Sequence, residues 1–152
     1  MNLTEHFLYE ELIASDWADR NGLDNSPPDS LLPNLTRLAK ALELVRMAVG
    51  NRPVVVSSGY RSPALNRAVG GSRTSAHMDG RAADIRVAGM RALDVARAVR
   101  DAGFDVFDQV IYEGGRVPWV HVGIAADGKA PRGMLMTASF VDGRAVYSYG
   151  LG

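Results

Sequence analysis

Two histidines and one aspartate stand out as residues that could do chemistry. Residues 75–84 read SAHMDGRAAD and contain His77 and Asp84, and residues 119–121 read WVH and end on His121. Asp84 lies between two apolar residues, where burying an unpaired charge would be costly and a nearby cation would remove that cost. Two imidazoles and a carboxylate form a zinc ligand set that leaves a fourth position open for water or substrate. The pattern predicts a metal-dependent hydrolase.

Other residues near this motif have weaker signals. The remaining histidine, His6, has no comparable motif around it, and we assign it no role. Ser75 precedes His77 by two residues and either orients that ligand, as groups around metal ligands commonly do, or contacts substrate. An ordinary loop serine fits its sequence context equally well.

The chain around these residues resembles the zinc D-Ala-D-Ala carboxypeptidase family, peptidase family M15, whose members cleave peptidoglycan stem peptides. The likeness is closest to the phage-associated branch. It extends over about residues 5–124, through SSGYRSPALN at 57–66, FDQVIYE at 107–113 and the opening segments 10–15 and 24–28. The resemblance implies Zn2+ as the cofactor, held by His77, Asp84 and His121, and a peptidoglycan stem peptide as the substrate.

Arg61 is the candidate for binding a substrate carboxylate. Its guanidinium can hold a carboxylate with two hydrogen bonds and stays charged at any working pH. In the family, the matching arginine binds substrate or stabilises the reacting oxyanion, whereas a plain surface arginine is the alternative. Further arginines crowd the same part of the sequence and suggest a locally positive cleft, namely Arg67, Arg73, Arg81 and Arg86.

The general base is the point where the sequence departs from the family pattern. The better-known members carry an acidic residue three positions before the last histidine ligand, but that position is Pro118, which has no acid–base group. The nearest acids are Glu113 and Asp108. Side chains alternate between the two faces of a strand, so these two acids should point in opposite directions.

Strand alternation favours Glu113 over Asp108. Glu113 lies on the same face of its strand as Gln109 and Ile111, and this can be the sheet face that carries His121. A one-residue bulge would reverse the assignment. Trp119 is expected to form a wall of the cleft and contact substrate. We expect one apolar face to hold Val110, Tyr112, Val120, Val122 and Ile124, together with Asp108.

Turn signals and apolar spacing predict an α+β domain. An amphipathic helix follows the breaker at 25–29, because apolar residues recur at three and four positions until Gly50. Helices packed on a small, mostly antiparallel sheet are expected. The predicted helices are 31–50, 62–69 and 90–102, and the predicted strands are 53–57, 81–87, 107–113, 117–124, 134–141 and 144–149, with tight turns at 114–116 and 142–143.

Composition narrows the possible partners and compartments. The 152 residues suit a single domain. Seventeen basic and seventeen acidic residues cancel, so no net field favours nucleic acid or anionic lipid, and the absence of cysteine excludes thiolate ligands. The N-terminus lacks a signal peptide pattern and no apolar run is long enough to insert into a membrane. We expect a monomer made in the cytoplasm that reaches the cell wall after release, as a phage lysis or virion-associated protein does.

Two functions from different classes remain open. One is an enzyme that hydrolyses D-Ala-D-Ala, L-Ala-D-Glu or a cross-bridge bond, as a carboxypeptidase or endopeptidase in cell-wall degradation, with Glu113 as general base. The other is a catalytically inactive, zinc-containing module that binds cell wall, an alternative favoured by the missing acid at Pro118.

Overall fold

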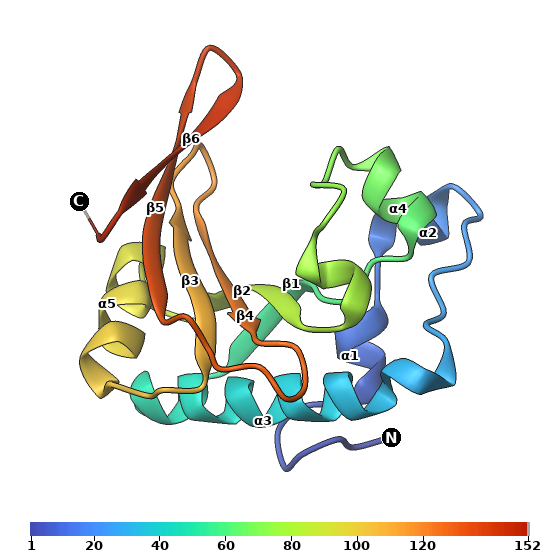
Figure 1. Ribbon diagram of the computed structural model, residues 1–152, viewed down its shortest axis with the longest axis horizontal. Helices are drawn as coiled ribbons and strands as arrows, with labels where there is room; N and C mark the ends of the chain where they lie inside the picture. Colours follow the sequence, from blue (N-terminus) through green and yellow to red (C-terminus); the bar gives the residue numbers. More distant parts are fainter. Residues whose placement is uncertain (152) are drawn as a thin grey trace.

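The computed structural model describes residues 1–151, which form a six-stranded sheet flanked by helices (Figure 1). The strand order is β1-β2-β4-β3-β5-β6, and all neighbours run antiparallel except β3 and β5, which are parallel. This arrangement confirms the predicted α+β class. The strands are β1 Val54–Ser58, β2 Ala82–Val87, β3 Phe107–Glu113, β4 Trp119–Ile124, β5 Met134–Val141 and β6 Arg144–Tyr149.

Five α-helices and two 3-10 helices surround the sheet within the described residues. None of these helices has the length and apolar character needed to cross a membrane. The α-helices are α1 Tyr9–Ile13, α2 Asp16–Arg20, α3 Leu32–Ala48, α4 Pro63–Ala68 and α5 Ala92–Ala102, and the 3-10 helices are η1 Asp29–Leu31 and η2 Ala76–Asp79.

The hydrophobic core lies between one face of the sheet and the helices α3 and α5. Leu35, Leu38 and Leu42 recur at three and four positions along α3 and are fully buried, as the apolar stripe predicts. Alternate residues of β4, Val120 and Val122, meet them from the sheet. The opposite sheet face is therefore left for polar side chains.

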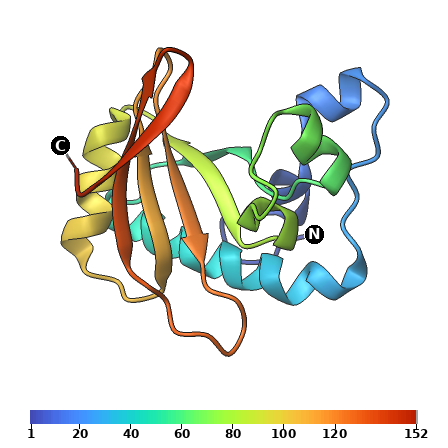
Figure 2. The same ribbon diagram turned by 45° about the horizontal axis from the view of Figure 1, so that its top comes forward.

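The two ends of the molecule carry different elements. Helices α1, α2 and α4 lie at one end, and the β5–β6 hairpin projects at the other (Figures 1 and 2). Asn25 ties the N-terminal segment to the residues after β1, because its amide donates to the carbonyl oxygens of Ile13 and Tyr60 and accepts from the Ser62 amide. This buried link fixes the backbone on both sides of Arg61.

Most predicted elements are confirmed, with two local differences in the β3–β4 hairpin. The second strand begins at Trp119 instead of residue 117, because Pro118 has no N–H for the ladder, and the connection spans 114–118. The register of β3 against β4 also shifts between Phe107 and Gln109, which places a bulge at Asp108. The short helices α1 and α2 were not among the predicted elements.

Candidate metal centre and active-site cavity

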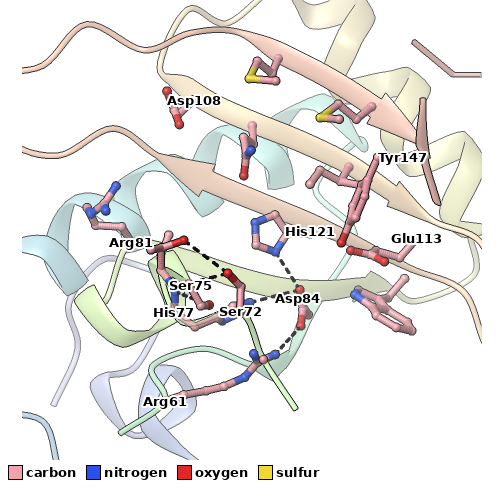
Figure 3. A pocket seen from close by; sticks show the side chains of 18 of the residues that line it. Arg61, Ser72, Ser75, His77, Arg81, Asp84, Asp108, Glu113, His121 and Tyr147 are labelled. Carbon is pink, nitrogen blue, oxygen red and sulfur yellow. Dashed lines mark hydrogen bonds and ion pairs between the residues drawn. The ribbon is translucent and has the colours of Figure 1, made fainter. Parts of the chain in front are cut away.

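His77, Asp84 and His121 come together as the sequence predicts. One ligand atom from each lies within 4.8 Å of the others. The Oδ1 atom of Asp84 is 3.4 Å from Nε2 of His77 and 3.1 Å from Nδ1 of His121. Figure 3 shows this carboxylate between the two imidazoles. The group can hold one cation, and its two nitrogen donors and one oxygen donor fit zinc.

Backbone geometry orients His77. The ring sits on the 3-10 helix η2, which ends at Gly80 with a left-handed φ of 68°. Its Nδ1 lies 2.7 Å from the carbonyl oxygen of Gly59, so this nitrogen carries the proton and donates to the carbonyl. When the ring is neutral, Nε2 therefore has the lone pair that a metal ligand requires, and this nitrogen faces Asp84.

Sheet register brings Asp84 and His121 together. They are direct partners in the antiparallel pairing of β2 with β4, so their side chains share a face. The His121 ring presents Nδ1 to Asp84, while its Nε2 lies 3.6 Å from where a Cβ on Gly123 would be. This spacing is an ordinary van der Waals contact, so the imidazole packs beside residue 123. This pair needs no loop to position it.

Arg61 lies against the other oxygen of Asp84. Its Nη2 donates to Oδ2 at 3.2 Å, its Nε to the Ser58 hydroxyl at 3.0 Å, and its Nη1 to the Asn66 side chain at 3.4 Å. Burial by itself would raise the pKa of Asp84, but hydrogen bonds from His121 and His77 and their charge hold that pKa well below its usual range. Asp84 is therefore ionised at any working pH. The Arg61 guanidinium has five N–H donors, so it keeps further N–H groups for another partner.

Glu113 lies on the same sheet face as the metal ligands. Ile111 pairs with His121 and Glu113 pairs with Trp119 in the β3–β4 ladder, so the alternation expected from the sequence is confirmed at this end of the hairpin. Glu113 lines the cavity that contains the cluster. Burial and the negative charge of Asp84 raise the pKa of Glu113, although the charges of His121 and Arg61 oppose this shift.

Asp108 corrects the strand argument at the other end of β3. It does not share the core face of Val110, because the bulge turns it to the cavity side, where it lies at the rim (Figure 3). Arg132 holds its carboxylate with three hydrogen bonds of 2.7–3.1 Å from the guanidinium, and the Arg132 backbone N–H donates a further one. The resulting ion pair lowers the pKa of Asp108 and occupies its oxygens.

The cavity around the cluster has a volume of about 680 Å3. Residues of η2 and the preceding loop form one wall, and the sheet with the β5–β6 hairpin forms the other (Figures 2 and 3). Glu113 and Tyr147 lie at one end, and Arg81 and Asp108 at the opposite end. The cavity is thus long enough to hold residues on both sides of a bond placed over the cluster.

The remaining candidates take different places in this cavity. Ser75 lines it, and its hydroxyl accepts from the His77 backbone N–H, so it stabilises the turn and not the imidazole. Trp119 also lines it, as expected. Among the additional arginines only Arg81 does so, paired with Asp79 at 2.9 Å. The locally positive cleft is therefore not observed, since Arg67, Arg73 and Arg86 lie outside it.

Comparison with known proteins gives two matches. A family model described as Peptidase M15 matches residues 5–123. A zinc D-Ala-D-Ala carboxypeptidase from Streptomyces albus G is 36% identical over 101 residues, which is 65% of this chain and 38% of the relative. The chain thus spans well under half of that relative's length. The family match includes His77, Asp84 and His121, and the β5–β6 hairpin lies beyond it.

Proposed function

Because the chain belongs to the M15 peptidase family, we propose that it hydrolyses an amide bond in peptidoglycan stem peptides, with zinc held by His77, Asp84 and His121. The observation that carries the proposal is the location of Glu113 and Arg61 in one cavity with this cluster. The name of the Streptomyces relative supports a substrate with D-amino acids. Zinc in such a site acts as a Lewis acid on the scissile carbonyl and makes water more acidic.

Glu113 acts as the general base in this proposal. Its carboxylate takes a proton from the attacking water and passes it to the leaving amine. Burial raises the pKa of Glu113 in the protein without a metal, and a cation at the cluster would oppose that shift, so the carboxylate is the form that meets the attacking water. The family's acidic position is Pro118 in this chain, and in this proposal Glu113 on the neighbouring strand supplies the acid instead.

Arg61 binds the charged part of the substrate or of the transition state. Its guanidinium is already oriented by Ser58, Asn66 and Asp84, so little side-chain entropy remains to be lost when a ligand binds. The remaining N–H groups can hold a carboxylate or the developing oxyanion. Trp119 forms the wall beside Glu113, and Ser75 contributes to the loop wall.

The length of the cavity favours an endopeptidase over a strict carboxypeptidase. A carboxypeptidase needs a closed end next to the scissile bond, whereas this cavity continues on both sides of the cluster. We propose that the natural setting is cell-wall lysis after release of the protein from the cell, as in phage. The inactive wall-binding module is the competing function.

A synthetic pentapeptide, L-Ala-γ-D-Glu-L-Lys-D-Ala-D-Ala, tests the proposal because it contains two of the three candidate bonds, L-Ala-D-Glu and D-Ala-D-Ala. The zinc-loaded protein should release products that mass spectrometry assigns to one bond, and Glu113→Gln should not. Cleavage after L-Ala identifies the endopeptidase, and loss of the terminal D-Ala identifies the carboxypeptidase. Binding of the peptide by the wild type without any cleavage would support the wall-binding module.

A further inference from the structure

Tyr147, in the hairpin beyond the family match, is brought to the Glu113 end of the cavity by strand pairing. Glu113 pairs with Ala138 of β5, and Ala138 pairs with Tyr147 of β6. Partners in such a row share a sheet face. Since Ala138 is fully buried and has only a methyl group, nothing larger separates the Tyr147 ring from Glu113. Figure 3 shows Tyr147 reaching toward Glu113.

Trp119 extends the same row on the other side of Glu113. It pairs with Glu113 across β3 and β4, and both residues line the cavity. Its indole Nε1 is buried and has no hydrogen-bond partner within residues 1–151. A buried N–H without an acceptor is rare in folded proteins and indicates that something else supplies the acceptor. Because Trp119 lines the cavity, a small turn of the indole on binding would bring this N–H to an acceptor on the ligand.

The Tyr147 hydroxyl is also available as a donor. No described residue forms a hydrogen bond with it, and 53% of the residue is exposed, so a ligand can reach it. Burial of the ring, followed by the negative charges of Glu113 and Asp84, raises the pKa of this hydroxyl. The hydroxyl therefore stays protonated at neutral pH, where it can donate a hydrogen bond but is not itself a base.

We propose that Tyr147 and Trp119 are a substrate-binding donor pair that holds one carbonyl or carboxylate oxygen of the peptide next to Glu113. This inference rests on the proposed function and adds a specificity-determining contact from the C-terminal hairpin. A peptide chain offers an acceptor oxygen at every residue. An ionised Glu113, which lies between Tyr147 and Trp119 in the row, repels an anion unless both donors bind it. The pair thus fixes which carbonyl lies beside the base.

The test measures binding separately from catalysis. Calorimetric titration of the pentapeptide L-Ala-γ-D-Glu-L-Lys-D-Ala-D-Ala into the zinc-loaded Glu113→Gln protein gives the reference affinity. Adding Tyr147→Phe should weaken binding by about 3- to 10-fold, the usual range for one neutral hydrogen bond. Replacing Trp119 by benzothienylalanine, which keeps the ring shape but lacks the N–H, should weaken it similarly. Tyr149→Phe is the matched control, because Tyr149 is on the same strand and 81% exposed.

The outcomes separate the two proposals. The donor pair is overturned if Tyr147→Phe leaves the peptide affinity unchanged, or if Tyr149→Phe lowers that affinity as much as Tyr147→Phe does. The proposed peptidase activity still stands in that case if the wild type cleaves the peptide. In contrast, a wild type that does not cleave together with a Glu113→Gln protein that does not bind overturns both. Because each donor contacts the same oxygen, the loss in the double variant should be smaller than the product of the single losses.

Discussion

The Nδ1 atom of His77 lies 2.7 Å from the carbonyl oxygen of Gly59, so a backbone group at the end of β1 sets the tautomer of a metal ligand on η2. This contact depends on close packing behind it. A Cβ on Gly59 would overlap the carbonyl oxygen of Leu12 in α1, and the Tyr60 N–H donates to that same oxygen at 2.7 Å. The orientation of His77 is thus linked to the docking of the N-terminal helix.

Gly59→Ala should therefore reduce both stability and zinc affinity. The added methyl group must displace α1 or the Gly59 carbonyl, and overpacking of this kind costs about 1–3 kcal/mol. Denaturant unfolding and competition with a zinc chelator measure the two effects. Gly115→Ala is the control, because its nearest neighbour would be the Phe140 ring at 3.4 Å. Equal stability and zinc affinity in Gly59→Ala and the wild type would show that Gly59 does not orient His77.

Each of the three ligands should be needed for zinc. His77→Ala, Asp84→Ala and His121→Ala each remove one of three protein donors, and we expect less than one zinc per chain in each purified variant. Asp79→Ala is the matched control, since Asp79 is two residues from His77 but pairs with Arg81 outside the cluster. Elemental analysis decides the matter. A folded wild type that keeps full activity after exhaustive chelation would contradict the scheme.

Glu113→Gln should lower turnover by about a hundredfold or more, the range for a positioned general base, without loss of zinc. Asp108→Asn should change turnover little, because Arg132 already occupies the Asp108 carboxylate. Because Arg132 is exposed, loss of this ion pair should lower the free energy of unfolding by only about 0.2–1 kcal/mol. Steady-state kinetics on the pentapeptide compare the two variants. If Asp108→Asn abolished turnover and Glu113→Gln did not, the assignment of the base would be reversed.

The positions of the candidate ligands and of Glu113 could be predicted because local rules determine on which strand face these side chains lie. Period-two alternation places Val120 and Val122 in the core and His121 on the other face, and the same alternation carries Glu113 to the cavity. The bulge at Asp108 interrupts that alternation and could not be located from residue types, since its origin is the register against β4.

Two kinds of contact could not be predicted from the sequence: those made by backbone atoms, and those that depend on the order of strands in the sheet. The Gly59 carbonyl that orients His77 has no side-chain signature. Tyr147 approaches Glu113 only because β5 pairs in parallel with β3 and carries β6 with it. That order depends on the packing of the whole sheet, and no motif around Tyr147 indicates it.

Arg61→Lys should keep the positive charge and still impair the enzyme. A lysine ammonium cannot reproduce the planar fork that contacts Ser58, Asn66 and Asp84 together. We expect a larger loss of kcat/KM on the pentapeptide with a free D-Glu α-carboxylate, the carboxylate beside the bond cut by the proposed endopeptidase, than on the pentapeptide with that group amidated. Kinetics on the matched pair of peptides measure this. An equal loss on both would assign Arg61 to orienting Asp84 and not to binding substrate carboxylate.

The ionisation of Glu113 provides the last prediction, made for the zinc-free protein. Burial, together with the charge of Asp84, raises the pKa of Glu113, so the folded protein favours its protonated form. This group therefore contributes stability below its unfolded-state pKa, and the contribution is lost as the pH rises through the raised folded pKa. Carboxyl NMR titration should place the pKa of Glu113 above the ordinary value for a glutamate. Added zinc should lower the pKa of Glu113, because a nearby cation favours the carboxylate. A pKa of Glu113 at the ordinary glutamate value that does not respond to zinc would mean that the carboxyl group lies away from both the cluster and the cavity wall.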